Sequence, residues 1–341
     1  MILIDAIYIN NSGGKVLLDY LVECLEKEDF NVFYLFDKRI ENNHPQIKLT
    51  NKVQFLEAGL WNRYFFYKEN NCNFTKVLCF GNLPPSIKLN STVYTYFHQP
   101  LFIKIPNNVT IINKFKIWLK TVILNILKKN TDYWIIQSVN VKNGLVKKYS
   151  LKDDSVIALP FYPPFDNDQV LVRKKNSFAY ISNGGIHKNH FKLLEAFQIF
   201  YDNFHLGELQ LTVSSEFGEL LKFIEDLKNK GYPITNYGFI KRNDLAAIYR
   251  TTEFLIFPSL AESFGLGIVE AIDNGCKVIG SNLPYMHAVC KPSIVFNPEL
   301  TEDICYAFEK AVTEEIRESE KIVFNEVDDL IKLLKTYENK K

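Results

Sequence analysis

The 341-residue chain lacks a long apolar run, although 47% of its residues are hydrophobic. No stretch of about 18 consecutive apolar residues occurs, so the sequence predicts no bilayer-spanning segment. Met1 leads directly into a strand-like run, without the basic region and cleavage site of a secretory signal. The six cysteines are scattered and form no C-x-x-C pair. We interpret them as reduced core residues of a cytoplasmic protein.

An excess of charge of either sign is also missing, because 40 basic residues face 39 acidic ones and the net charge is +1. Nucleic-acid-binding proteins usually carry a clear basic excess, so nucleic acid is not expected as a partner. The sequence also lacks G-x-G-x-x-G, which disfavours a dinucleotide cofactor. A Gly13-Gly14 pair follows the first apolar run. Its amides can approach a phosphate, although such a pair is more often only a turn.

What the sequence does contain is a regular alternation of short apolar runs and helical patterns. Strands are expected at 2–9, 31–36, 76–80, 92–97, 133–137 and 155–159, with helices at 15–27 and 139–149. After a proline-rich break at 160–168 the alternation resumes, with strands at 178–182, 208–214, 234–237, 253–257 and 277–280 and helices at 188–204, 217–230, 243–249 and 264–274. Such alternation predicts parallel sheets with helices on both faces.

We therefore predict an α/β fold of two doubly wound, Rossmann-like domains facing across a cleft. The expected domains are 1–165, 166–320 and a C-terminal helix at 321–341 that is able to pack back on the first domain. The whole stretch 314–341 has the pattern of a charged amphipathic helix. Ligands of doubly wound sheets bind at the carboxyl ends of the strands, which places the expected site in the cleft.

Two carboxylates, Glu262 and Glu270, stand eight positions apart around a turn from a strand into a helix. Ser263 is expected to cap that helix, while Gly265 and Gly267 allow close backbone approach at its start. A phosphate there would meet unpaired N–H groups and the positive end of the helix dipole. Carboxylates accept hydrogen bonds from sugar hydroxyls, so the pattern suits a sugar joined to a nucleotide. The alternative is two carboxylates without a ligand, one at the surface and one stabilised by the helix dipole.

These residues resemble the nucleotide-sugar domain of a retaining glycosyltransferase of the GT-B architecture, family 4, also described as glycosyl transferases group 1. The resemblance covers about 178–300. It rests on Glu262-x7-Glu270, His187-Lys188-Asn189-His190, Tyr237-Gly238-Phe239-Ile240 and the segment 274–281, in which Lys277 stands where proline is usual. The first half is less similar and corresponds to the acceptor side.

The resemblance implies roles for individual residues. Glu270 is expected to bind the donor ribose, and Glu262 the transferred sugar or the adjoining phosphate. Lys188 would neutralise the departing diphosphate, and His98 would contact a donor sugar hydroxyl or position the acceptor. The remaining expected donor-binding residues are Gly13, Gly14, Phe239, Ile240, Ser263, Phe264, Gly265, Leu266 and Gly267.

Several of these residues have alternative interpretations. Many relatives carry an arginine six positions before the lysine, but this chain has Ser182 there, which leaves Lys188 to act with backbone amides. Lys188 could also be a solvated surface charge, and His98 an ordinary loop histidine. His187 and His190 have helical spacing, yet no third ligand for zinc is identifiable.

Two further segments bear on cofactors and partners. Asp166-Asn167-Asp168 has the D-x-D spacing of metal-dependent glycosyltransferases, but it lies in the linker, so we interpret it as a solvated turn and expect no metal and no cofactor. The segment 113–129 has five lysines and no acidic residue, and Phe115, Leu119, Val122 and Ile126 share one helical face. This helix either rests on an anionic membrane surface or packs in the fold with a basic outer face.

The resemblance implies a metal-independent hexosyltransferase that uses a UDP- or GDP-sugar and a carbohydrate or lipid-linked glycan acceptor. It would work in surface polysaccharide or lipopolysaccharide synthesis, in the cytoplasm or on the inner face of the cell membrane. The alternatives are a non-catalytic nucleotide-sugar-binding subunit, or another GT-B enzyme such as a nucleotide-sugar epimerase. A glycogen-type phosphorylase would need a pyridoxal phosphate lysine, and the sequence shows no such context.

Overall fold

The computed structural model describes residues 1–105, 110–165 and 171–336, and within them the chain folds as two compact units. Of the described residues, the first unit contains 1–105, 111–163 and 324–336, and the second contains 110, 164–165 and 171–323. Asp166, Asn167 and Asp168 lie outside the described residues. Within these residues, no helix is both long and apolar enough to cross a membrane.

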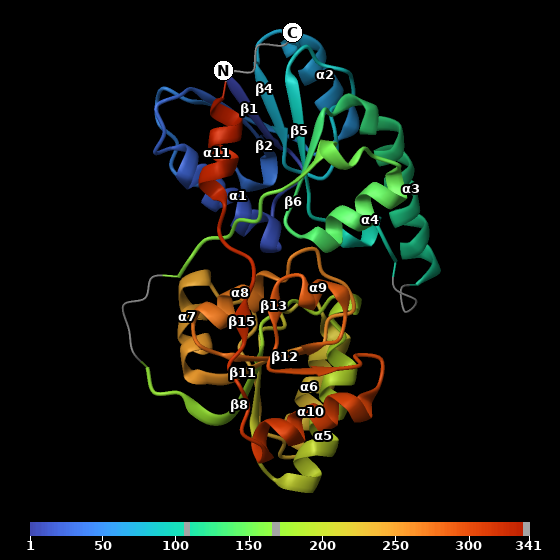
Figure 1. Ribbon diagram of the computed structural model, residues 1–341, viewed down its shortest axis with the longest axis vertical. Coiled ribbons are helices and arrows are strands. Elements are labelled where there is room, and N and C mark those ends of the chain that lie inside the picture. Colours follow the sequence, from blue (N-terminus) through green and yellow to red (C-terminus); the bar gives the residue numbers. More distant parts are fainter. Residues whose placement is uncertain (106–109, 166–170, 337–341) are drawn as a thin grey trace. The chain divides into compact units, whose positions relative to one another are not determined.

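The first unit is built on a seven-stranded parallel sheet with the order β3-β2-β1-β4-β5-β6-β7, of which Figure 1 labels β1, β2, β4, β5 and β6. The strands are β1 (Ile2–Ala6), β2 (Val32–Asp37), β3 (Lys52–Leu56), β4 (Lys76–Cys79), β5 (Thr92–Phe97), β6 (Tyr133–Ile136) and β7 (Val156–Ala158). Every residue of β1, β4 and β5 is buried. Central strands of a parallel sheet are covered on both faces, which explains why their side chains do not alternate between buried and exposed.

Helices α1 (Ser12–Leu25), α2 (Leu60–Asn70), α3 (Ile111–Leu127) and α4 (Val139–Tyr149) connect these strands, with short 3₁₀ turns η1 (Lys38–Ile40), η2 (Pro100–Phe102), η3 (Lys128–Asn130) and η4 (Asp153–Ser155). The end of the chain supplies one more helix, α11 (Val327–Lys335), beside α1 (Figure 1). The Lys76 ammonium donates to the Leu333 carbonyl at 2.5 Å, and Asn325 donates to the Tyr20 hydroxyl at 2.7 Å. The C-terminal helix is therefore part of the first unit.

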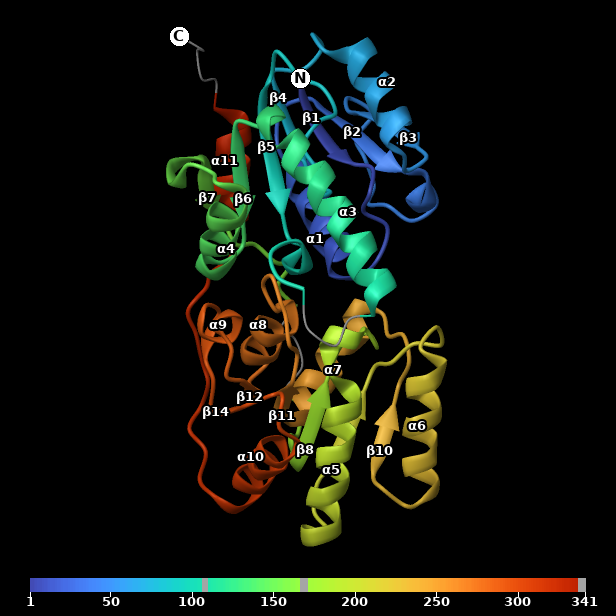
Figure 2. The same ribbon diagram turned by 90° about the vertical axis from the view of Figure 1, so that its right-hand side faces the viewer.

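The second unit is built on a six-stranded parallel sheet with the order β10-β9-β8-β11-β12-β14 (Figure 2). Its strands are β8 (Lys174–Tyr180), β9 (Glu208–Leu211), β10 (Ile234–Asn236), β11 (Thr252–Phe257), β12 (Lys277–Ser281) and β14 (Ile294–Phe296). The helices are η5 (Ile186–Lys188), α5 (His190–Phe204), α6 (Gly218–Asn229), α7 (Arg242–Thr251), α8 (Leu266–Asp273), α9 (Pro284–His287) and α10 (Thr301–Thr313). The ring of Phe178 on β8 packs against Phe200 of α5 and Phe308 of α10, which fixes these helices to the sheet.

The predicted α/β fold with two parallel sheets is confirmed, but the prediction of one helix over 314–341 is wrong. Of its described residues, only Val327–Lys335 is an α-helix. Glu320–Lys321 instead forms strand β15, paired antiparallel with β13 (Cys290–Lys291). The hydroxyl of Ser319 accepts hydrogen bonds from the N–H groups of Val278 and Ser293, at 2.8 and 3.1 Å. These contacts hold the segment extended against the sheet of the second unit, despite its helical pattern.

Candidate active site

The turn between β11 and α8 is shaped by a glycine in the left-handed conformation. Gly265 has φ +77° and occupies the N-cap of α8. A Cβ at this position would lie 2.7 Å from Cδ1 of Ile268, so a side chain would be both strained and crowded. The prediction that Ser263 is the capping residue is wrong, because the helix begins only at Leu266 and its N-cap position is occupied by Gly265. In the first turn of α8 the Ile268 N–H donates to the Gly265 carbonyl at 2.8 Å, which leaves the N–H groups of Leu266 and Gly267 to receive an anion.

Lys188 and Glu262 form an ion pair across this turn. The lysine ammonium lies 2.5 Å from Oε1 of Glu262, and the two side chains are only 15% and 12% exposed. Lys188 follows β8 and Glu262 follows β11, and these strands are neighbours at the point where the strand order reverses. Such a switch point is where doubly wound sheets bind ligands. Lys188 is therefore not a solvated surface charge.

Backbone and hydroxyl contacts fix the loop that carries Lys188. The Leu260 N–H donates to the His187 carbonyl at 2.8 Å, and the Tyr180 hydroxyl donates to the Lys188 carbonyl at 2.9 Å. Lys188 thus reaches the turn before α8 from a loop that two different elements hold. A cation held in this way can stabilise charge that develops on a bound phosphate.

The two histidines near Lys188 are neutral, His190 in a buried position and His187 in a half-buried one. Burial lowers the pKa of His187 to about 4 and that of His190 to about 3. His190 is 2% exposed, its ring lies 4.7 Å from that of Tyr180, and neither ring nitrogen has a hydrogen-bond partner among the residues that the structure describes. Among the described residues, no group of three His, Cys, Asp or Glu side chains could hold a metal. The expectation that the site needs no metal stays a prediction.

Glu270 is buried between α7 and α8. Arg242 donates from Nη1 to Oε1 of Glu270, and the Tyr249 hydroxyl donates to Oε2 at 3.2 Å. Burial raises the pKa of this carboxyl, and Arg242 opposes the rise. Neither Arg242 nor Tyr249 was predicted as a site residue. Their spacing was the available signal, because residues seven positions apart lie on one face of a helix.

The expected nucleotide-base contacts lie just before α7. Phe239 is 84% exposed and Ile240 is half-buried. Both residues follow β10, so they lie at the same carboxyl edge of the sheet as Lys188 and Glu262. No contact in the structure assigns a base to them, and their role stays a prediction.

The first unit brings Gly14 and His98 together at the carboxyl ends of its own strands. A Cβ at Gly14 would lie 3.4 Å from Nε2 of His98, whereas a Cβ at Gly13 would meet nothing within 4 Å. Burial lowers the pKa of His98 to about 4. Asn82, which was not predicted, accepts a hydrogen bond from the His98 N–H at 2.6 Å. The sequence feature that could have indicated Asn82 is its position shortly after the buried strand β4.

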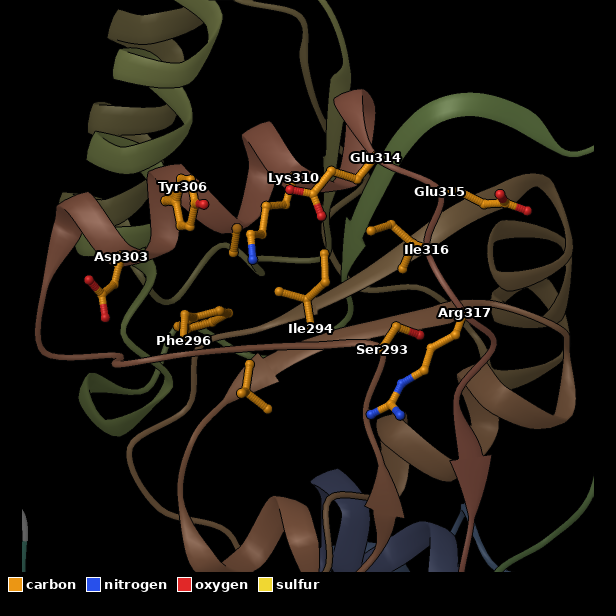
Figure 3. Close-up of a pocket in the computed structure, with 12 residues that line it drawn as sticks. Ser293, Ile294, Phe296, Asp303, Tyr306, Lys310, Glu314, Glu315, Ile316 and Arg317 are labelled. Atoms are coloured by element: carbon orange, nitrogen blue, oxygen red, sulfur yellow. The ribbon is translucent and has the colours of Figure 1, made fainter.

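A cavity of about 500 Å³ opens elsewhere on the second unit (Figure 3). Strand β14, helix α10 and the segment 314–317 line it, and Lys310 of α10 extends toward Ile294 and Phe296 (Figure 3). None of the predicted donor-binding residues belongs to its lining. The cavity and the Lys188–Glu262 pair are therefore separate places on this unit.

Solved structures that resemble this chain define its fold class. Sucrose-phosphate synthase from Thermosynechococcus elongatus superposes with a TM-score of 0.72 at 16% identity, over 91% of this chain and 88% of that one. WaaG, a glycosyltransferase involved in lipopolysaccharide biosynthesis, gives 0.67 at 13% identity, over 92% and 90%. The chain thus has the predicted GT-B fold, with one parallel-sheet domain in each unit.

Part of the chain matches a known sequence family. Residues 163–323, slightly less than half of the chain, match the family described as glycosyl transferases group 1. The predicted resemblance to that group is confirmed. Assignment to family 4 and retention of configuration stay predictions.

Curated relatives align with about half of the chain. Serotype-specific mannosyltransferase WbdA from Escherichia coli is 27% identical over 173 residues, which are 50% of this chain and 19% of that protein. O-antigen chain mannosyltransferase RfbU from Salmonella typhimurium is 23% identical over 184 residues, 52% of this chain and 50% of that protein. The aligned part of this chain therefore covers at most half the length of these relatives.

Proposed function

We propose that this protein is a glycosyltransferase that moves a hexose from a UDP- or GDP-sugar to a carbohydrate or lipid-linked glycan, with retention of configuration and without a metal ion. The observation that carries this proposal is the 2.5 Å ion pair between Lys188 and Glu262 beside the Gly265 turn. It puts a cation, helix-end amides and a hydroxyl-accepting carboxylate in one place. A sugar diphosphate needs these three groups together.

In the proposed reaction, negative charge develops on the departing diphosphate. The bond between the sugar C1 and the diphosphate oxygen breaks, and the oxygen leaves with the electron pair. Lys188 and the first-turn amides of α8 stabilise the negative charge that develops there. The acceptor oxygen bonds to C1 on the face that the diphosphate leaves, and its proton passes to the departing phosphate. Glu262 accepts a hydrogen bond from a sugar hydroxyl, and Glu270 accepts from the ribose.

The names of the relatives support the biological setting. Two are mannosyltransferases with serotype or O-antigen chain in their names, and a structural neighbour is a lipopolysaccharide outer core galactosyltransferase. We place this chain in surface polysaccharide or lipopolysaccharide synthesis, with a mannosyl group as the favoured hexose. Its place of action would be the cytoplasm, at the inner face of the membrane that carries the acceptor.

Helix α3 supports that location. Of its residues, only Thr121 and Leu124 are buried, while Phe115 and Trp118 are 62% and 54% exposed and their rings stack at 5.7 Å. A helix packed in the fold through Phe115 would bury that ring. The exposed apolar side chains stand among lysines, with no acidic residue, which suits an anionic lipid surface.

A binding panel followed by a transfer assay tests the proposed function. UDP-, GDP- and ADP-sugars are screened by thermal shift on the wild type, on Lys188→Ala and on Lys222→Ala, a control that removes an exposed lysine of α6. We expect one base to stabilise the wild type and the control, and Lys188→Ala to lose roughly 100-fold or more in transfer rate. A folded wild type indifferent to every nucleotide sugar overturns the proposal. Binding without transfer to any glycan would instead favour the non-catalytic subunit.

A further inference from the structure

The Glu270 carboxylate already has a donor on each oxygen. Arg242 donates to Oε1, and the Tyr249 hydroxyl donates to Oε2 at 3.2 Å. Glu270 is only 5% exposed. A carboxylate has about four lone-pair sites, so two acceptor sites remain after these bonds. Two hydroxyls on adjacent carbons, as in a ribose, match that remaining capacity.

Arg242 is itself held in place. Its guanidinium carbon lies 4.2 Å from the ring centroid of Phe165, and the rings of Phe165 and Tyr249 are 6.1 Å apart. Arg242 and Tyr249 stand on one face of α7, so a single helix delivers both donors to Glu270. A planar guanidinium with fixed donors orients a carboxylate more strictly than a lysine ammonium does.

The charge of Arg242 matters because Glu270 is buried. Removing a carboxylate from water favours its protonated form, and this effect raises the pKa of Glu270. The nearby guanidinium counteracts it, as a charge and as a hydrogen-bond donor. Removing only the cation would leave a buried carboxylate without a counter-ion, which takes up a proton more readily.

The other ionisable groups around Glu270 do not replace this cation. The Tyr249 hydroxyl donates a hydrogen bond but carries no charge, and burial raises its pKa. Asp273 raises the pKa of Glu270 and forms an ion pair with Lys321 of β15. Burial raises the pKa of Cys276 to about 11, so this thiol is neutral. Among the described groups that shift the pKa of Glu270, Arg242 is the one that carries a positive charge.

We propose that Arg242 is a positioning residue of the donor site. It keeps the Glu270 carboxylate ionised and in one orientation, so that this carboxylate accepts hydrogen bonds from the two ribose hydroxyls of the nucleotide. This inference rests on the proposed function and extends it to the recognition of the ribose. Replacing Arg242 should make ribose recognition depend on pH, because protonation of Glu270 removes a strong acceptor.

The experiment measures UDP and GDP binding to the full chain by calorimetry between pH 5.5 and 8.5. The proteins are the wild type, Arg242→Gln, Arg242→Lys and Lys241→Gln, a control that removes the exposed neighbouring charge. Dividing each variant's Kd by the wild-type Kd at the same pH cancels titration of the nucleotide phosphates. For Arg242→Gln we expect a ratio of about 10 or more at pH 6 that shrinks toward about 3 at pH 8.5, since one pH unit changes the ionised fraction up to tenfold.

The companion measurement uses the 2′-deoxy forms of UDP and GDP. We expect the wild type to bind them roughly tenfold more weakly than the ribose forms, which corresponds to one hydrogen bond to a charged acceptor. Arg242→Gln should lose most of this discrimination at pH 6. The ratios for Lys241→Gln and Arg242→Lys should stay flat with pH, because both keep a cation at position 242.

The possible results separate the positioning role of Arg242 from the proposed function. A Kd ratio for Arg242→Gln that is the same at every pH, with discrimination against the deoxy forms intact, overturns the positioning role while the proposed function stands. A wild type that binds neither UDP nor GDP overturns both. Thermal melts check folding, and should Arg242→Gln not fold, Arg242→Lys carries the test. A pH-dependent ratio for Arg242→Lys contradicts the proposal, since its ammonium preserves the charge.

Discussion

The side-chain amide of Asn82 contacts His98 in two places. Its Oδ1 accepts the backbone N–H of His98 at 2.6 Å, and its Nδ2 lies 3.2 Å from the ring atom Nε2. Because the oxygen has to face the N–H donor, Nδ2 has to face the ring. Nδ2 is a donor, so Nε2 accepts, and a neutral His98 carries its proton on Nδ1.

This arrangement predicts the protonation state of His98 and its dependence on Asn82. Burial lowers the pKa of His98 to about 4, so the ring should stay neutral from pH 5.5 to 8. In nitrogen-15 histidine NMR we expect the Nδ1–H tautomer and no titration over that range. Asn82→Ala removes the donor and should mix the two tautomers. If His98 contacts substrate, transfer should also slow roughly tenfold, the size of one hydrogen bond.

The control is Asn90→Ala, which removes an exposed asparagine whose side-chain amide donates to Sγ of Cys72 at 3.6 Å. It should leave the His98 signals unchanged. A wild-type His98 that titrates near its ordinary pKa, or that carries its proton on Nε2, would contradict the assignment.

The buried histidines predict a loss of stability in mild acid. His190 has a pKa of about 3 in the folded chain because burial disfavours its charged form, against about 6.5 for an unfolded histidine. Between these values the unfolded chain binds a proton that the folded chain does not. The free energy of unfolding should therefore fall below pH 6.5, by about 1.4 kcal/mol per pH unit for each such histidine.

Denaturant unfolding of His190→Phe from pH 7 to pH 5 checks this expectation. Phenylalanine keeps a ring against Tyr180 and removes the two ring nitrogens that lack partners. The variant should lose less stability on acidification than the wild type. His205→Asn is the control, because His205 is exposed at φ +49°, a conformation that asparagine tolerates. Equal pH slopes for the wild type and His190→Phe would refute this explanation.

The sequence was sufficient to predict the alternation of strands and helices, because central strands such as β5, which are buried on both faces, consist of β-branched and aromatic residues along their whole length. It did not predict β3, whose first three residues are exposed at the sheet edge. Helix periodicity at 314–341 was misleading because pairing with β13 holds part of that segment extended. A local pattern carries no information about such a partner.

In the candidate site, too, some residues were predicted from the sequence and others were missed. The motif residues Lys188 and Glu262 were predicted and do meet, because each follows a neighbouring strand of one sheet. Asn82 and Arg242 were missed, since their importance depends on contacts with His98 and Glu270 that only the folded chain creates. Residues that support a site are distant in sequence from the residues they orient. The seven-residue spacing of Arg242 and Tyr249 places them on one face of a helix, but it does not say which carboxylate that face meets.

Gly265→Ala is predicted to destabilise the second unit and weaken nucleotide-sugar binding. An alanine would have to adopt φ +77°, and its Cβ would lie 2.7 Å from Cδ1 of Ile268. The left-handed conformation alone costs about 1–2 kcal/mol. Gly218→Ala is a matched control, because a Cβ at this helical position meets nothing within 4 Å. It should leave stability unchanged or raise it by about 0.4–1 kcal/mol. Similar unfolding midpoints for the two variants would disprove the role given to Gly265.

The last prediction concerns the membrane surface and α3. Co-sedimentation with vesicles of neutral phosphatidylcholine, or of phosphatidylcholine with 30% phosphatidylglycerol, separates apolar from electrostatic binding. We expect binding to the anionic vesicles, weakened by salt because the lysines of α3 contribute about 1 kcal/mol each at such a surface. Phe115→Ala combined with Trp118→Ala should weaken it at least tenfold, since about 1.4 kcal/mol of lost burial suffices. Trp61→Ala, which removes a 75% exposed tryptophan from α2, is the control and should bind as the wild type does. Equal binding to both kinds of vesicle, or equal loss in the control, would rule α3 out as the contact.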